Sequence, residues 1–494
     1  MDAAEYHKQF DELERRRQEQ LERSPEAIRK VHDQGLLTCE ERLDLLLDPT
    51  PRWRFGQSAG ASPVDVGIGE IHGRPVAYKA HDLTVNSGIY TFQSMGVMES
   101  MRGFARRAGI PVFQLFQGGG GMINMRAMSS AFAAVGGQRV GASWAFPARE
   151  TVFTAVLGNA FAPWAVASAD FAAMSQNASA TVVSPFIVEF ATGKRPDVYE
   201  MGGADVHSKI TGQVHRVGED EAETIGLLRK AFSYLPSNAF EAAPRVLTGD
   251  PPDRRDEELR SIVPPYPNRA YDVRKVIERI VDRDSFFEWL PEFGKSLITG
   301  LCRFDGYTVA IMANQPTQQA GTVGTESMTK LQRLMRCVND HRLPLVTLTD
   351  TPGSLTTLEE EHKGLLVESL RSSADLLHAT GPNVGVVLGK GIGFGYFLMG
   401  NSSPESITLA WPQVQIAYLG AEGGASVVHR KKLGSAGKER RAMLEELASP
   451  FRAGMSPWRA AHMAVIDNVI DPADTRPMII RALDVQRSEV GAKS

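Results

Sequence analysis

Cysteine is scarce in this chain, with only Cys39, Cys302 and Cys337 among 494 residues. Their spacing fits neither a disulfide framework nor a zinc site. The first residues, MDAAEYHKQFDELERRRQEQLERS, are charged throughout and lack the apolar core of a secretory signal. These absences predict a protein of the reducing cytoplasm.

The chain also lacks an excess of charge of one sign and a long apolar run. It carries 54 Lys and Arg against 58 Asp and Glu, and no basic block dominates its sequence, which argues against a general role on nucleic acids or membrane surfaces. The most apolar window, residues 152–169, contains Thr154, Asn159, Pro163 and Ser168, so it indicates buried core instead of a membrane span.

Several common catalytic and nucleotide-binding motifs are missing. No G-x-x-x-x-G-K-[ST] or G-x-S-x-G occurs, and GKGIGFG (389–395) is not the dinucleotide pattern G-x-G-x-x-G. His207 and His215 do not have the spacing of metal ligands, so we expect no metal. The expected partner is a small molecule or another protein.

The chain repeats itself on either side of a stretch rich in proline and charge. Gly73 and Gly306, in IHGRPVA and FDGYTVA, are 233 residues apart, as are Pro111 and Pro344 in GIPVFQLFQGGG and RLPLVTLTDTPG. Gly158 and Gly389 follow at 231 residues. The pattern predicts a tandem duplication. We expect a charged helix over 1–30, one domain over 31–250, a linker over 251–270 and a second domain over 271–494.

Each copy alternates strands with helices and ends its strands in glycine-rich turns, which is typical of the α/β class. The four turns are QGGGG (117–121), GNAFAP (158–163), TPGS (351–354) and GKGIGFGY (389–396). Backbone N–H groups at such turns can bind a developing oxyanion, although many glycine turns only serve packing.

Several stretches resemble the carboxyltransferase β subunits of acyl-CoA carboxylases, such as propionyl-CoA and methylcrotonyl-CoA carboxylase. They include GLLTCEERLDLLLDP (35–49), GGADVHSKITGQVHRV (202–217), AYDVRKVIERIVDRDSFFEW (270–289) and AWPQVQIAYLGAEGGASVVHRKKL (410–433). The resemblance runs from about residue 28 to the C-terminus. It implies two crotonase-like ββα-spiral domains of the ClpP/crotonase fold in tandem.

The resemblance also implies a mechanism and partners. Acyl-CoA is expected on the N-terminal domain of one subunit and carboxybiotin on the C-terminal domain of another, within a trimer-based homo-oligomer, a hexamer. The biotin would be carried by a partner, a biotin carboxyl carrier or biotin carboxylase subunit, because the chain contains no Met-Lys dipeptide and hence no A-M-K-M biotinylation motif. One oxyanion hole would stabilise the acyl-CoA enolate and the other the ureido oxygen of biotin.

The turns depart from the family pattern at the positions that would donate to these oxyanions. In the first domain the two glycine donors map to Ala162 and Pro163, and proline has no N–H. A shift by one residue would make Phe161 and Ala162 the donors instead. In the second domain the donors map to Phe394 and Gly395.

Further positions map to the substrate site. Met122 stands where the family commonly has Arg, and Phe397 occupies a position that tunes acyl size. The substrate-binding positions implied by the resemblance are Gly119, Gly120, Gly121, Gly158, Phe161, Gly202, Gly203, Gly393 and Phe397.

Three functions remain open at this point. The first is a carboxyltransferase subunit of a biotin-dependent acyl-CoA carboxylase. The second is a biotin-independent acyl-CoA decarboxylase or hydrolase that keeps the CoA platform. The third is a non-catalytic paralogue within a carboxylase complex.

Overall fold

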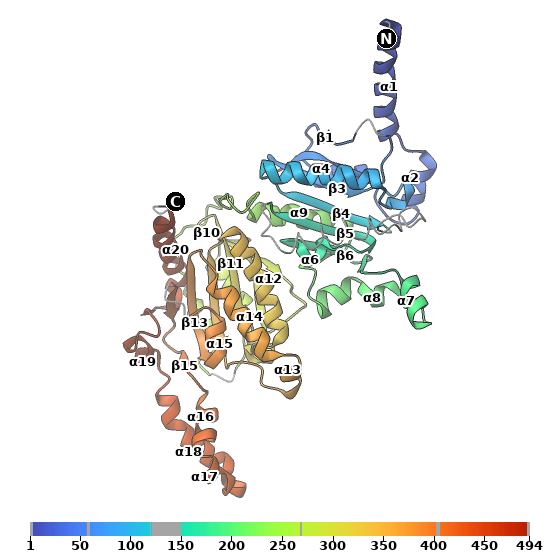
Figure 1. Cartoon of the computed structure of the whole chain (residues 1–494). Helices are drawn as coiled ribbons and strands as arrows, with labels where there is room; N and C mark the ends of the chain where they lie inside the picture. The colour runs from blue at the N-terminus through green and yellow to red at the C-terminus, as the bar shows by residue number, and fades with distance from the viewer. Residues whose placement is uncertain are drawn as a thin grey trace. The chain divides into compact units, whose positions relative to one another are not determined.

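The structure, a computed structural model, describes residues 3–56, 60–118, 120, 150–266, 269–401 and 406–491. The chain divides into two compact units, Met1–Ala242 and Ala243–Ser494 (Figure 1). The boundary therefore precedes the proline-rich stretch, and residues 251–266 belong to the second unit. They are held there because Arg254 forms an ion pair with Asp250 and the Asp256 N–H donates to the Ala473 carbonyl.

The first unit is built on one mixed sheet, ordered β1-β2-β3-β4-β5-β6-β8, with β7 paired to β5. β2 pairs antiparallel with both β1 and β3. The remaining pairs are parallel. The strands are β1 (Trp53–Arg54), β2 (Val64–Ile71), β3 (Arg74–His81), β4 (Val112–Gly118), β5 (Val152–Phe161), β6 (Phe171–Ser175), β7 (Ser179–Thr181) and β8 (Arg216–Gly218).

Helices cover both faces of this sheet. α4 packs on β2 and β3, α3 packs on β3 and α9, and α9 packs on β5, β6 and β8. α4 begins at a Thr91 capping box and ends at Gly109, which adopts a left-handed conformation. The helices are α1 (Ala3–Leu21), α2 (Pro25–His32), α3 (Cys39–Leu46), η1 (Asn86–Gly88), α4 (Phe92–Ala108), α6 (Ala165–Ser168), α7 (Pro185–Thr192), α8 (Val198–Gly202), η2 (Val206–Ile210) and α9 (Glu221–Tyr234).

The second unit repeats the sheet, ordered β16-β14-β13-β12-β11-β10-β9, with β15 paired to β13. Its strands are β9 (Phe287–Trp289), β10 (Leu297–Phe304), β11 (Tyr307–Asn314), β12 (Leu345–Thr351), β13 (Asn383–Ile392), β14 (Ile407–Ala410), β15 (Gln415–Ala417) and β16 (Asn468–Val469). Buried aliphatic side chains of β12 and β13, among them Val346, Leu348 and Val386, form the main core of this unit.

The helices of the second unit follow the same plan. α12, the counterpart of α4, packs on β10 and β11, and α20 packs on β13. The helices are α10 (Leu259–Ile262), α11 (Arg274–Ile280), η3 (Gln319–Gly321), α12 (Thr325–His341), α13 (Leu358–His362), α14 (Leu365–Leu377), α15 (Gly393–Leu398), α16 (Ala421–Val428), α17 (Arg430–Gly434), η4 (Gly437–Glu439), α18 (Arg440–Ala453), α19 (Pro457–His462), η5 (Pro472–Asp474) and α20 (Thr475–Gly491).

The duplication extends to backbone detail. α4 and α12 each have 17 residues, and β5 and β13 each have 10. Each short helix before them has a left-handed residue at its centre, Ser87 (φ 52°) in η1 and Ala320 (φ 56°) in η3. The two units are therefore copies of one design, as the repeated sequence predicts.

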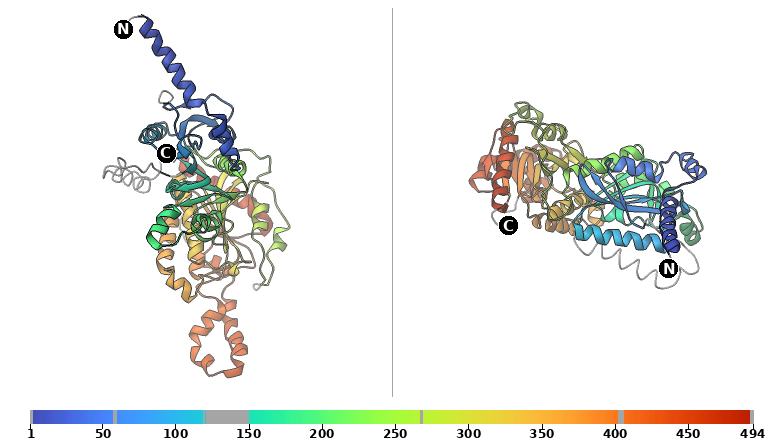
Figure 2. Two further views of the ribbon diagram at one scale, coloured as in Figure 1. Left: turned by 90° about the vertical axis from the view of Figure 1, so that its right-hand side faces the viewer. Right: turned by 90° about the horizontal axis from the view of Figure 1, so that it is seen from above.

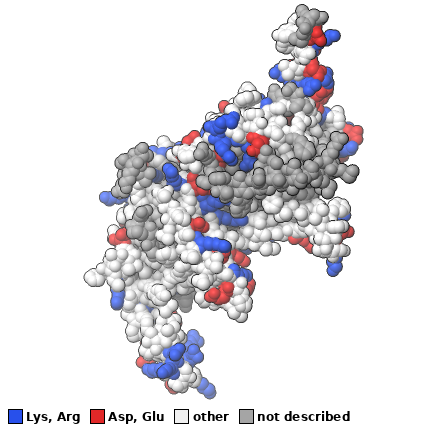
Figure 3. Space-filling view, viewed as in Figure 1, with Lys and Arg blue, Asp and Glu red and all other residues white. Residues whose placement is uncertain are grey.

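Two helical segments project from the sheets of their own units, α1 from the first and α16 to α18 from the second (Figures 1 and 2). Basic side chains gather over α17 and α18 (Figure 3), although the sequence has no single dominant basic block. The exposed residues of this cluster are Arg430, Lys431, Lys432, Lys438, Arg440 and Arg441.

Candidate active site

The turn after β5 is the first candidate oxyanion hole. β5 ends at Phe161, Ala162 adopts a left-handed conformation (φ 54°), and α6 follows. The Ala162 N–H donates to the Thr181 carbonyl of β7 at 2.7 Å, and the Trp164 N–H donates to the Ala162 carbonyl at 2.9 Å. Pro163 has no N–H. Of residues 162 to 164, two have their N–H groups bonded inside the protein and the third has none.

In this arrangement the Ala162 N–H is not free for the donor role expected of it, and that role stays a prediction. Its N–H continues the parallel pairing of Phe161 with Thr181, so it is directed at a strand. The alternative in which Phe161 and Ala162 both donate loses the same group. Asn159, considered as a side chain that could replace a donor, accepts a hydrogen bond from the Ser179 hydroxyl at 2.8 Å.

The turn after β4 lies beside this one. Gly118 (φ 129°) and Gly120 (φ 78°) adopt conformations that favour glycine, and the Gly120 carbonyl accepts from the Tyr90 N–H at 2.9 Å. A Cβ on Gly158 would lie 2.4 Å from Nε2 of Gln117, so this glycine allows the two strand ends to meet. Gly119, Gly121 and Met122 lie outside the described residues.

Gly202 and Gly203 lie at the end of α8, against the strand that pairs with the end of β5. A Cβ on Gly202 would lie 2.3 Å from the Ala180 carbonyl oxygen. His207 bonds the same carbonyl through Nε2 at 2.7 Å. These glycines therefore lie against β7 and α8, where the backbone approaches too closely for a residue with a Cβ.

The turn after β13 is the second candidate hole. Gly393 (φ 55°) opens α15, so Phe394 and Gly395 lie in its first turn, where N–H groups have no partner within the helix. A Cβ on Gly395 would lie 2.9 Å from Cα of Gly353, which places the TPGS turn directly against α15. The Phe394 ring stacks on Phe397 with centroids 5.7 Å apart.

The strand registers define which residues of the two turns are equivalent. Gly118 pairs with Ala160 in the first sheet, and Thr351 pairs with Gly391 in the second. Ala162 therefore matches Gly393, and both residues have nearly the same φ. Pro163 matches Phe394, and Gly395 matches Trp164. The donors expected from the sequence, Ala162 and Pro163 in one turn and Phe394 and Gly395 in the other, are therefore not equivalent positions. The pair in the first turn lies one residue earlier than the pair in the second.

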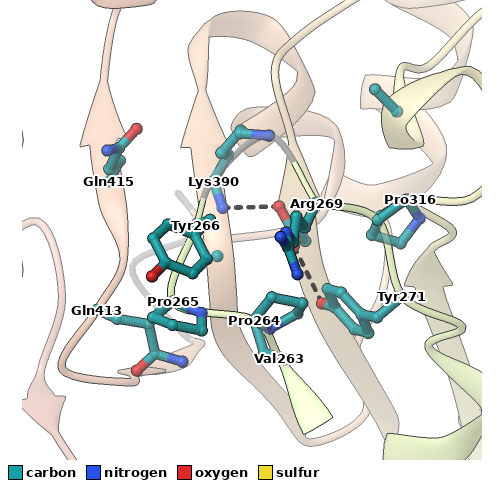
Figure 4. Close-up of a pocket in the computed structure, with 14 residues that line it drawn as sticks. Val263, Pro264, Pro265, Tyr266, Arg269, Tyr271, Pro316, Lys390, Gln413 and Gln415 are labelled. Atoms are coloured by element: carbon teal, nitrogen blue, oxygen red, sulfur yellow. Dashed lines mark hydrogen bonds between the residues drawn. The ribbon is translucent and has the colours of Figure 1, made fainter. Parts of the chain in front are cut away.

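A pocket in the second unit lies next to the second turn. It has a volume of about 120 Å³ and is lined by Pro264, Tyr266, Arg269, Asp350, Lys390 and Gln413, among others. Asp350, which is buried, accepts from the Lys390 N–H at 2.8 Å and from the Tyr271 hydroxyl at 3.0 Å, the two bonds dashed in Figure 4. Burial raises the pKa of Asp350, while these bonds oppose the shift.

The matching place in the first unit is closed by a different set of side chains. Gln117 takes the place of Asp350, and its amide oxygen accepts from the Arg42 guanidinium. Arg42, 1% exposed, also binds Glu221 through Nε at 2.6 Å and Nη2 at 2.8 Å. Sequence reasoning missed both networks. TDTPG belongs to the internal repeat and AYDVRK to a stretch of the resemblance, but nothing in the sequence pairs Tyr271 with Asp350.

Within the described ranges, no cluster of three or more His, Cys, Asp or Glu side chains has the arrangement of a metal site. Among those same residues, no helix has both the length and the apolar character needed to cross a bilayer.

Comparisons with known proteins agree with this architecture. Residues 30–492 match the family model described as carboxyl transferase domain. The propionyl-CoA carboxylase carboxyltransferase subunit of Haloferax mediterranei is 31% identical, over 97% of this chain and 96% of that protein. The methylmalonyl-CoA decarboxylase subunit alpha of Veillonella parvula is 30% identical, over 94% and 92%.

A solved structure extends the likeness to three dimensions. The crystal structure of transcarboxylase 12S, described as a hexamer with methylmalonyl-coenzyme A and methylmalonic acid bound, superposes with a TM-score of 0.87 at 28% identity. The superposition covers 98% of this chain and 95% of that one. The chain therefore belongs to the carboxyl transferase family of acyl-CoA carboxylases, built as two crotonase-like domains in tandem.

Proposed function

We propose that this protein transfers a carboxyl group between biotin carried on a partner protein and an acyl-CoA, as part of a homo-oligomer, a hexamer. Family membership over nearly the whole chain supports the reaction class. The observation that carries the proposal is the turn after β13, where two N–H groups in the first turn of α15 can donate to an oxyanion.

The residues of the second unit fit a ureido group. Backbone N–H donors at Phe394 and Gly395 suit its carbonyl oxygen, and the neighbouring pocket offers polar groups of Lys390 and Gln413. When bound, carboxylated biotin supplies the activated carboxyl group. The chain's own part is to bind both partners, orient them and stabilise developing negative charge on oxygen with fixed donors.

The acyl-CoA is proposed to bind the first unit at Gly118 to Gly121 and at Gly158. The N–H groups of Ala162 and Trp164 are already bonded and Pro163 has none, so this unit positions the thioester with little help from the 162–164 turn. We therefore expect the enolate step to be slow compared with a site that has two free donors.

A matched pair of variants tests the proposal. Phe394→Pro copies Pro163 into the second unit, removes one N–H and keeps helical geometry, because proline is tolerated in the first turn of a helix. Phe394→Ala also removes the ring but keeps the N–H. Transfer of labelled carboxyl from malonyl-type CoA to a biotinylated carrier should fall about 10²–10³-fold in Phe394→Pro relative to Phe394→Ala.

Two outcomes would contradict the proposal. Equal transfer by the two variants would show that this turn is not the oxyanion hole. Wild-type protein that releases CO2 from malonyl-type CoA without labelling the carrier would instead support a biotin-independent decarboxylase. The bonded state of the 162–164 turn bears equally on that second candidate, since decarboxylation and carboxylation of an acyl-CoA pass through the same thioester enolate.

A further inference from the structure

A lysine is buried in the first unit with aromatic rings around its amine. Lys79 lies on β3 and is 7% exposed. Its Nζ lies 3.7 Å from the centroid of the Phe116 ring and 5.1 Å from the centroid of the Tyr90 ring. Lysine is almost never this buried unless it is paired, so the contacts of this amine need an explanation.

No carboxylate neutralises the amine in the part of the chain that the structure describes. No ion pair or hydrogen bond to Nζ is found there, and residues 121–149 contain no Asp or Glu. The charged group that acts on it is Arg102 of α4, another cation. Burial and Arg102 hold the pKa of Lys79 well below its usual range, so the uncharged amine is more accessible than in an exposed lysine.

The repeat shows that packing alone does not require a lysine here. By the strand registers, Lys79 of β3 matches Met312 of β11, which is fully buried in the second unit. An unbranched apolar side chain therefore fills the same position. The amine adds a desolvation cost, and within the described residues only the Phe116 and Tyr90 rings offset it, with no ion pair or hydrogen bond.

The surroundings connect this amine to the turn after β4. The Tyr90 hydroxyl bonds His81 Nε2 at 2.6 Å, and the Tyr90 backbone N–H bonds the Gly120 carbonyl at 2.9 Å. Lys79, His81 and Tyr90 thus form one cluster directly beneath the glycine turn of the first unit. None of the three has a role in the proposed transfer.

We propose that Lys79 is a CO2-reactive lysine whose amine reversibly forms a carbamate. The nitrogen lone pair attacks the carbon of dissolved CO2, a C–N bond forms, and one C=O electron pair moves onto oxygen. The nitrogen then loses one proton to solvent base, so Lys–NH2 and CO2 give Lys–NH–COO⁻ and H⁺. No oxidant or reductant takes part.

The cluster suits both the approach of CO2 to the amine and the binding of the carbamate that forms. The Phe116 and Tyr90 rings beside the amine favour an apolar gas such as CO2, while the partial exposure of Lys79 leaves a route for the proton to solvent. Arg102 and the Tyr90 hydroxyl offer positive charge and a hydrogen bond to the new carboxylate. The inference does not depend on the proposed transfer, because it requires only the folded chain and CO2.

Chemical trapping tests the carbamate directly. Full-length protein is equilibrated with ¹³C-bicarbonate and CO2, treated with a trialkyloxonium salt that alkylates carbamates, and digested for mass spectrometry. The expected result is a ¹³C-labelled alkyl carbamate on Lys79, with occupancy that rises with CO2 and approaches one per chain. Lys79→Met, which copies Met312 of the second unit, should lose the label while keeping its thermal melting profile.

Lys330 provides an internal control. It is also fully buried, but its Nζ donates to the Leu290 carbonyl at 2.8 Å and the Phe293 carbonyl at 3.0 Å. We expect no label on Lys330. An unlabelled Lys79 at saturating CO2, or equal labelling of Lys79 and Lys330, would overturn the assignment.

Discussion

Replacing Pro163 with glycine should speed the chemistry of the first unit. The substitution adds an N–H at the position that matches Phe394 of the second unit, while the Ala162 N–H keeps its bond to Thr181. One oxyanion donor is worth about 2.7–4 kcal/mol, which corresponds to about 10²–10³ in rate when the chemical step is limiting. We expect the rate of the chemical step to rise by this factor, with no contribution from the Ala162 N–H.

The substitution also has a cost in stability. Glycine increases the conformational freedom of the unfolded chain, which lowers the free energy of unfolding by about 1 kcal/mol. Pro163→Ala is the matched control, because it restores the same N–H with less added freedom. Both variants are compared with the wild type for carboxyl transfer or decarboxylation at saturating acyl-CoA, and for thermal unfolding.

The result that refutes this reasoning is specific. If both variants fold normally and neither is faster, the N–H at residue 163 does not face the reacting oxygen. In that case the first unit positions the thioester by other groups, and Pro163 only shapes the turn. A gain in Pro163→Gly without one in Pro163→Ala would indicate backbone freedom as the cause.

Three further predictions concern two buried charged groups and one aromatic stack. Burial lowers the pKa of Lys330 to about 7, so between pH 7 and 10 the unfolded chain binds more protons at this lysine than the folded chain does. The free energy of unfolding should therefore rise by about 1.4 kcal/mol per pH unit over this range. Chemical denaturation should show this slope for the wild type and not for Lys330→Met. Arg42→Met should lower the free energy of unfolding by about 3–5 kcal/mol, because Glu221 stays buried without its partner. Chemical denaturation measures this loss, and the double variant Arg42→Met, Glu221→Gln should recover most of it. Phe397→Ala removes the stack on Phe394 and should raise kcat/KM for larger acyl-CoAs about tenfold relative to short ones.

The fold could be predicted far better than the site. The duplication can be recognised because Gly73, Gly306, Pro111 and Pro344 occupy matching turns, and turns impose specific backbone requirements on residue type. The repeat then predicts that the two sheets share one strand order, as they do. Such residues carry their structural meaning locally, so a single sequence is enough to recover it.

The chemistry of the turns could not be predicted in the same way. A sequence shows that Pro163 lacks an N–H, but whether the Ala162 N–H is free depends on how β7 pairs with β5. The pairing of Arg42 with Glu221 joins residues 179 apart in the chain. Contacts of this kind depend on tertiary packing, and no local pattern indicates them.

The left-handed residue in the first turn gives a prediction that separates stability from catalysis. Ala162 (φ 54°) and Gly393 (φ 55°) have nearly the same backbone conformation, which is unfavourable by about 1–2 kcal/mol for a residue with a Cβ. Ala162→Gly relieves that strain but adds freedom to the unfolded chain, so we expect a net stabilisation of about 0.5–1 kcal/mol.

The reverse change, Gly393→Ala, is the matched control. It introduces the same strain and places a Cβ 3.0 Å from the Tyr418 carbonyl oxygen, so it should destabilise by more than about 1 kcal/mol. Because the Ala162 N–H is bonded to Thr181 in either form, Ala162→Gly should leave the rate of the first unit unchanged. A rate that rises with Ala162→Gly, at unchanged acyl-CoA affinity, would mean that this N–H leaves Thr181 during turnover and serves the oxyanion after all.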